Sequence, residues 1–147
     1  MTARRGAAIG SERGSVTLEL AILTPALILL LALMVLVGRV QVATSAVEHA
    51  AHVAARDASL ARTPEAARTA AVTAALRELT AQDVDCTSPD VTVDTTGFAA
   101  PLGQPARITA TVTCLVDFTD LAAPAPLPGS RSLTGTATSA LDAWRTR

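Results

Sequence analysis

The feature that most constrains this chain is a run of 19 residues without a charge, residues 20–38, dominated by Leu, Ala, Ile and Val. At about 1.5 Å rise per residue a helix of this length spans about 28 Å, close to the hydrocarbon thickness of a bilayer. Inside lipid the backbone polar groups must be satisfied within the segment, so the run must be helical. Pro25 removes one backbone hydrogen bond, and we expect a kink there. The sequence therefore predicts a transmembrane helix over residues 15–38.

Charge on the two sides of the run predicts its orientation. Residues 1–18 carry three Arg and one Glu, a side-chain net charge of +2, whereas residues 40–147 carry eight Arg and eleven Asp or Glu, a net of −3. Basic flanks stay in the cytoplasm, so we expect a cytoplasmic leader over residues 1–14 and a C-terminal part outside. The alternative is a signal peptide cleaved near residues 43–45, although the run exceeds the roughly 7–15 residues of an ordinary signal core.

Glu19 stands at the start of the apolar run, five positions after Gly14. A carboxylate costs roughly 2.5–3.5 kcal/mol at the centre of a membrane helix and less near its end. A buried charge is tolerable when it is paired, so Glu19 is a candidate site for pairing with a positive group. The alternative is that its side chain only reaches the membrane interface from the end of the helix.

Composition indicates one small domain with a thin core after the helix. The chain has 147 residues, of which 2% are aromatic, and all twelve of its basic residues are Arg. A small core usually needs a covalent staple or an assembly partner. Cys86 and Cys114 lie in the part that we place outside, where thiols oxidise, so we expect a disulfide between them. It would stabilise the fold by roughly 3–4 kcal/mol, and two free thiols are the alternative.

Residues 39–61 continue the helical pattern as a stalk, with small apolar residues on one face and polar residues on another. Nothing between residues 38 and 60 is a strong helix breaker, so one helix could run from about Ser15 to Leu60, a length of about 65–70 Å. The apolar face consists of Val40, Ala43, Val47, Ala50, Ala54 and Ala58, and the polar stripe of Gln41, Ser45, Glu48, His52, Arg56 and Ser59.

A second helix is predicted from Pro64 to about Ala81. Thr63 suits the N-cap, Pro64 the first helical position and Glu65 the first turn. The residues that we expect this helix to bury are Ala67, Ala71, Ala74, Ala75 and Leu79.

From Cys86 onward the hydrophobic period changes to two, which indicates strands with one apolar and one Thr-rich face. The apolar face of a sheet needs cover, which the helices can supply. The predicted fold class is therefore α+β, with a long N-terminal helix, a short second helix and a small antiparallel sheet in an extracytoplasmic head over residues 62–147. Strands are expected at residues 91–94, 106–118 and 133–138, and loops at residues 101–105 and 123–129.

Catalytic chemistry has little support in the sequence. His49 and His52 stand near Glu48, but they lack the His-Glu-x-x-His order that places two metal ligands and a base together. A nucleophile needs a neighbouring base, and the chain has only two His. We therefore expect no enzyme activity, no cofactor and no metal site. The slightly negative net charge, −1, argues against nucleic acid as a partner.

Residues 12–25, with the sequence ERGSVTLELAILTP, resemble the N-terminus of TadE-like minor pseudopilins of the bacterial tight-adherence (Flp, type IVb-like) pilus systems. The family pattern is a basic leader, a glycine, a glutamate five residues later and a proline about six residues further on. Gly14, Glu19 and Pro25 have these spacings. The close resemblance covers about residues 12–40, and beyond it only the layout of a helical stalk and Thr- and Val-rich strands is similar.

The resemblance implies a function in assembly at the cell membrane. A prepilin-type peptidase would cut after Gly14 and leave Ser15 with a free amine, so that Glu19 becomes the fifth residue of the mature chain. In pilin-like assemblies such a glutamate pairs with the amine of a neighbouring subunit and sets the axial register. The implied partners are the membrane, that peptidase, other pilins or pseudopilins and inner-membrane pilus assembly proteins.

Two features specify the resemblance further. Many prepilins carry an aromatic residue where this chain has Ser15, and the head is larger than the tail of a major pilin of this type. The resemblance therefore favours a minor pseudopilin that acts in initiation, in priming or at the tip of a surface pilus. Two other functions stay open: a static single-pass accessory protein that keeps residues 1–14, and a secreted binding module that loses residues 1–45.

Overall fold

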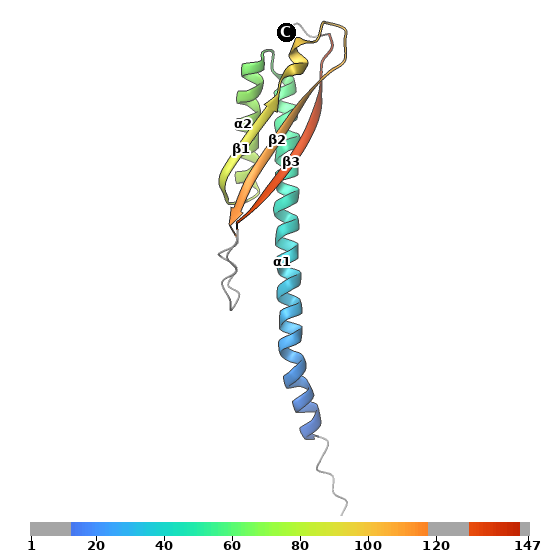
Figure 1. The fold of residues 1–147 in the computed structure, drawn as a ribbon, viewed down its shortest axis with the longest axis vertical. Coiled ribbons are helices and arrows are strands. Elements are labelled where there is room, and N and C mark those ends of the chain that lie inside the picture. Colours follow the sequence, from blue (N-terminus) through green and yellow to red (C-terminus); the bar gives the residue numbers. More distant parts are fainter. Residues whose placement is uncertain (1–12, 118–129, 145–147) are drawn as a thin grey trace, which may run out of the picture. The chain divides into compact units, whose positions relative to one another are not determined.

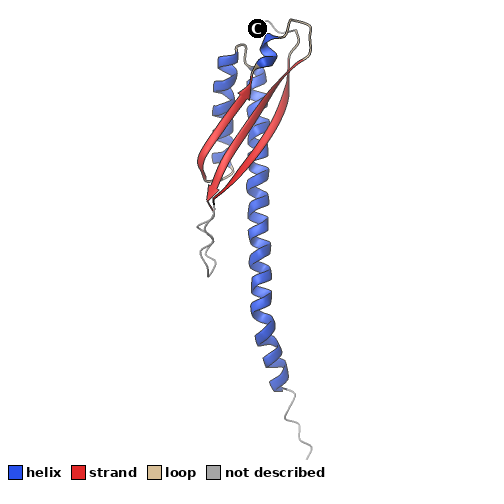
Figure 2. Ribbon diagram, in the orientation of Figure 1, coloured by secondary structure: helices blue, strands red, loops and turns tan. Residues whose placement is uncertain are grey.

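The computed structural model describes residues 13–117 and 130–144, with side chains from Glu19 onward. The fold class is α+β, as predicted (Figure 1, Figure 2). The chain divides into two compact units after Gly38. The elements in chain order are α1 (Arg13–Leu60), α2 (Pro64–Ala81), β1 (Cys86–Asp94), the 3-10 helix η1 (Thr96–Ala99), β2 (Ala106–Asp117) and β3 (Ser130–Leu141).

The helix α1 is one continuous element of 48 residues, and its first part forms the N-terminal unit. Pro25 lies inside α1 without ending it. The neighbouring Thr24 donates a hydrogen bond from its Oγ1 to the carbonyl oxygen of Leu20 (2.6 Å), which gives this hydroxyl a partner on an otherwise apolar helix. From Glu19 onward, α1 is long and apolar enough to cross a membrane.

The second unit, residues 39–147, includes both the predicted stalk and the predicted head, and it is called the head from here on. Its part of α1 supplies an alanine-rich face for packing. Val40 and Ala43, which were predicted on this face, are only half-buried. Small side chains allow the sheet and the second helix to approach α1 closely, because a close-packed interior leaves no room for gaps. The buried positions are Ala46, Val47, Ala50, Ala51, Ala54, Ala55, Ala58 and Ser59.

Ser59 contradicts the predicted polar stripe, whose other five members are exposed. The Ser59 residue is only 8% exposed. Its hydroxyl donates to the carbonyl oxygen of Arg56 (2.7 Å) and accepts from the Oγ of Ser139 in β3 (3.0 Å). These partners make the burial of a hydroxyl tolerable. The helical period could not indicate this, because Ser139 is 80 residues away along the chain.

The second helix, α2, has the predicted bounds and the predicted buried face. Thr63 is the N-cap in an extended conformation, and its side chain accepts a hydrogen bond from the backbone N–H of Ala66 (3.2 Å). Pro64 begins the helix, and Glu65 lies in its first turn. Gln82 caps the other end, and Asp83 follows in the left-handed region with φ 55°. The buried residues are Ala67, Ala71, Ala74, Ala75 and Leu79, as expected.

The three strands form one antiparallel sheet in the order β1-β2-β3. β2 and β3 pair without interruption from Ala106↔Leu141 to Asp117↔Ser130, whereas β1 carries a bulge between Cys86 and Ser88. Alternate residues of β2 and β3 face the helices, and the intervening threonines face away. The buried sheet residues are Ala106, Ile108, Ala110, Val112, Cys114, Val116, Leu133, Gly135, Ala137 and Leu141.

The strands β1 and β3 are longer than the alternating pattern predicted. β1 begins at Cys86 and includes Pro89, which an edge strand tolerates because one side of its backbone has no ladder to maintain. β3 extends to Leu141, and η1 was not predicted. Phe118 and the predicted loop at residues 123–129 lie outside the described residues.

Candidate functional site

The residues of the predicted processing site, Gly14 and Ser15, lie in the first turn of α1. Glu19 follows one turn later and is exposed. Among the described side chains, Glu19 has neither an ion-pair partner nor a hydrogen-bond partner. The next acidic residue on the helix is Glu48. Glu19 is thus a single carboxylate at the edge of a long apolar surface, where an unpaired charge is costly.

Beyond Glu19 the helix surface is apolar on all sides. Large side chains from Leu20 to Val37 are mostly more than half exposed within the N-terminal unit, for example Ile22 at 68%. Thr24 lines a shallow groove of about 440 Å³ along one face of the helix. Such a surface suits lipid or the apolar faces of other helices. The groove is lined by Leu20, Leu23, Thr24, Ala26, Leu27 and Leu30.

The predicted disulfide is present in the head. Cys86 and Cys114 are bonded, with a Cα–Cα distance of 5.3 Å and a sequence separation of 28. Cys114 is fully buried in the central strand β2, and Cys86 is half-buried at the start of the edge strand β1. The bond fixes β1 to β2 at the bulge, where the regular pairing of the two strands is interrupted.

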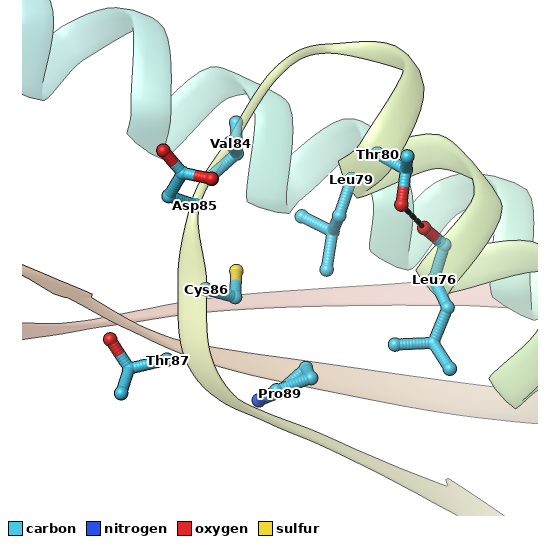
Figure 3. Close-up of a pocket in the computed structure, with 8 residues that line it drawn as sticks. All are labelled: Leu76, Leu79, Thr80, Val84, Asp85, Cys86, Thr87 and Pro89. Carbon is cyan, nitrogen blue, oxygen red and sulfur yellow. Dashed lines mark hydrogen bonds between the residues drawn. The ribbon is translucent and has the colours of Figure 1, made fainter.

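A pocket of about 410 Å³ lies beside the disulfide, between the end of α2 and the start of β1 (Figure 3). Leu76, Leu79 and Val84 supply apolar surface, and Asp85 is its only acidic residue. The hydroxyl of Thr80 is bonded to the carbonyl oxygen of Leu76 (2.9 Å).

The stalk histidines do not form the arrangement considered from the sequence. The Nδ1 atom of His49 lies 3.1 Å from Oε1 of Glu78 on α2, and Nε2 of Gln82 donates to the same Glu78 oxygen (2.8 Å). Glu48, by contrast, lies against β3 at Gly135. His49 therefore lies against α2, whereas Glu48 lies against β3. No group of three His, Cys, Asp or Glu side chains in the described part of the chain could hold a metal ion.

The contact between His49 and Glu78 was not found from the sequence. It connects the two helices of the head, together with an ion pair between Arg77 and Asp57 (3.8 Å). Both contacts join residues about 20 to 30 positions apart, and charge spacing within one helix gives no signal for such a pairing.

One N-terminal helix of membrane-crossing length and a small disulfide-bonded α+β head define the class: an α+β protein with a candidate single-span anchor. Residues 14–56 match the family model of TadE-like proteins, which confirms the resemblance seen in the N-terminal sequence. This family is structural and pilus-associated. The match includes Gly14, Glu19 and Pro25 and ends within the head part of α1, before α2 and the sheet. No curated protein and no solved structure matches the chain significantly.

Proposed function

We propose that the chain is a non-catalytic, pilin-like assembly subunit, a minor pseudopilin of a bacterial tight-adherence pilus or a related secretion machine. One observation carries the proposal: the TadE-like match begins at Gly14 and includes Glu19, the exposed carboxylate at the start of the apolar helix. The proposal gives a function to the most costly polar group of the anchor.

In this proposal the N-terminus is cytoplasmic, the helix crosses the membrane, and the head lies outside. A prepilin-type peptidase removes residues 1–14, and Ser15 becomes the new N-terminus. Its α-amine is positively charged near neutral pH, since such groups have a pKa of about 7.7–8.0. That amine and the Glu19 carboxylate are then four positions apart on one mature chain.

The carboxylate of Glu19 pairs with the Ser15 amine of a neighbouring subunit. Removing two charges from water is favourable only when they approach closely with good geometry, so the pair selects one axial register between adjacent helices. The apolar surface around the groove at Leu23 and Leu27 packs against those helices. Inner-membrane assembly proteins and other pilins or pseudopilins are the partners, and no step requires a cofactor.

The path of α1 through residues 43–45 favours an anchored protein over a secreted module. α1 is helical throughout this segment, and Thr44 is bonded from its Oγ1 to the carbonyl oxygen of Val40 (2.8 Å). The next residues, Ala46 and Val47, are each 1% exposed in the core of the head. Cleavage here would leave the core helix to begin at its first buried turn, with terminal N–H groups that lack helical partners.

N-terminal sequencing and intact-mass measurement of the protein from native membranes test the proposal. We expect a chain that begins at Ser15. A start at Met1 or Thr2 would contradict processing and favour a static accessory protein, and a start near Ala46 would favour a secreted module. Gly14→Leu should block the cleavage, whereas Gly10→Leu, a matched change in the same leader, should leave it intact.

A further inference from the structure

The strand β3 is an edge strand with one open side. It pairs with β2 over its full length, from Ser130 to Leu141, and no bulge interrupts the register. In the part of the chain that the structure describes, no backbone hydrogen bond is made on its other side. A regular row of backbone N–H and C=O groups twelve residues long is a template for an additional strand.

The opposite edge of the sheet is closed to such pairing. β1 carries Pro89, which lacks an N–H donor, the bulge between Cys86 and Ser88, and two exposed carboxylates, Asp90 and Asp94. Prolines, bulges and charges are the devices that prevent strands from adding to an edge. β3 has no proline and no bulge, and its single charged residue, Arg131, is the second of the strand. An additional strand can therefore pair with the β3 edge of the sheet but not with the β1 edge.

The part of α1 that packs against β3 also carries exposed charged residues. The Cα atom of Glu48 lies against Gly135, and Ser59 is hydrogen-bonded to Ser139, so this side of the helix follows β3. We name Glu48, His52 and Arg56 the polar rail: all three are exposed and follow one another at four-residue spacing along α1, beginning at Glu48 beside Gly135.

The opposite side of α1 is occupied by α2. His49 contacts Glu78, and Asp57 contacts Arg77, so residues on that side are already engaged. Figure 1 shows α2 on the β1 side of the head and β3 at the other side of the sheet. A strand that is added to β3 would therefore place its inner side chains near the polar rail and not near α2.

We propose that the open edge of β3 accepts an extended strand from another pilin-type subunit of different sequence. This inference rests on the proposed function. The strand carries small or hydroxyl residues on its outer face, continuing the threonine rows of β2 and β3. On its inner face it carries charged residues that complement the acid and the two bases of the polar rail. Main-chain hydrogen bonds supply affinity, and the alternate side chains supply specificity.

A second copy of this chain fits the edge less well. α1 and β3 run in the same direction, because Glu48 lies at Gly135 and Ser59 lies at Ser139. Two β3 strands paired antiparallel about a two-fold axis would therefore place two α1 helices antiparallel. Arg39, at which α1 enters the head, would then lie at opposite ends of the pair. Two chains anchored through that end in one membrane cannot adopt this arrangement, and head-to-tail addition meets the closed edge of β1.

Hydrogen exchange of the backbone amides tests the proposal on the full chain. The peptide covering Ser130–Leu141 is compared between the isolated protein in detergent micelles and the assembled machine purified from native membranes. In the isolated protein about half of its amides should exchange fast, because alternate residues point away from β2. In the assembly these amides should exchange at least about tenfold more slowly, while Cys86–Asp94 of β1 changes little. Equal β3 exchange in both samples would overturn the proposal.

Two matched variants separate the edge from the face of the sheet. Thr136 in β3 and Thr111 in β2 are direct cross-strand partners on the same outer face, with a distance of 3.2 Å between their Oγ1 atoms. Thr136→Lys places a charge on the open edge, and Thr111→Lys places the same charge on the central strand. We expect Thr136→Lys to lose the protection of β3 in the assembly and Thr111→Lys to keep it. Loss in both, with unchanged melting temperatures, would assign the contact to the threonine face and overturn strand addition.

Three further results distinguish this inference from the proposed function. A chain that never enters an assembly would overturn both. A chain that assembles with β3 exchanging as fast as in the isolated protein would overturn strand addition alone. Protection of β3 that rises with concentration in the isolated protein would identify a second copy as the occupant, against the partner proposed.

Discussion

Gly135 of β3 lies directly on the backbone of α1 at Glu48. A Cβ atom at position 135 would be 2.8 Å from the Cα atom of Glu48 and 2.8 Å from the carbonyl oxygen of Val47, closer than Cβ atoms approach other atoms. The strand and the helix therefore meet backbone to backbone, which only glycine permits. This contact places Glu48, the first residue of the polar rail, at β3.

Gly135→Ala should lower the free energy of unfolding by about 1–3 kcal/mol, because the added methyl group must displace the backbone of either α1 or β3. Denaturant unfolding of the full chain in micelles measures the effect. Thr136→Ala is the control, since Thr136 is exposed on the other face of the same strand and its loss should cost less. Equal stability of Gly135→Ala and the native chain would mean that α1 can move away from β3 without cost.

Replacing both cysteines, as in Cys86→Ser with Cys114→Ser, should destabilise the head by roughly 3–4 kcal/mol, because the unfolded chain regains the entropy of a loop of about 29 residues. The core has little to compensate, since most of its buried residues are alanine. Reductant should shift the unfolding midpoint of the native protein and leave that of the double variant unchanged. A native protein with the same midpoint in reductant would show that the bond contributes nothing to stability.

The periodic parts of this fold could be predicted from the sequence, and the contacts between distant elements could not. Ala67, Ala71 and Leu79 repeat at helical spacing, so the buried face of α2 was visible before its partner was known. Ser59 was placed wrongly, because its burial depends on Ser139 in a strand far along the chain. Gly135 likewise looked like an ordinary strand position. Position 135 requires glycine because the backbone of α1 lies so close to it, and no local sequence pattern encodes the distance between β3 and α1.

The N-terminal helix was predicted more completely than the head for a physical reason. Lipid would impose one requirement on every residue of a membrane-crossing segment, so the length and composition of residues 20–38 were sufficient to predict a helix. The start of β1 was missed because Pro89 interrupts its alternation. An edge strand accepts a proline, but the sequence alone does not say which strand is at the edge.

Asp94 should titrate below its usual range. Its Oδ1 accepts a hydrogen bond from the backbone N–H of Thr96 (2.9 Å), and this bond, together with one from the Thr96 side chain, lowers the pKa of Asp94 below 3.8. Because the pKa is lower in the folded state, the carboxylate stabilises the fold above the pKa of the unfolded state. That contribution is lost as the pH falls through the folded pKa.

An NMR titration of the Asp94 carboxyl group measures this shift. Thr96→Ala should raise the pKa only part of the way to 3.8, because the backbone hydrogen bond, the larger cause, remains. A pKa at or above 3.8 in the native protein would contradict the hydrogen bond at Asp94.

Glu19→Ala should leave membrane insertion intact and prevent incorporation into a pilus. Removing the carboxylate makes the start of the apolar helix less costly to insert, so the variant should reach the membrane fraction at native levels. It also leaves the Ser15 amine of the neighbouring subunit without its partner, so the register between subunits is lost. Immunoblots of membranes and of sheared pili measure the two steps separately.

Glu19→Gln distinguishes charge from polarity at the same position. If the carboxylate pairs with an amine, Gln should fail in assembly as Ala does, because a neutral amide cannot replace the ionic partner. Glu65→Ala, which removes an exposed acid from the head, should leave the yield unchanged. A normal content of Glu19→Gln protein in pili would remove the pairing function of Glu19. Together with an N-terminus that retains Met1, it would make a static membrane accessory protein the better description.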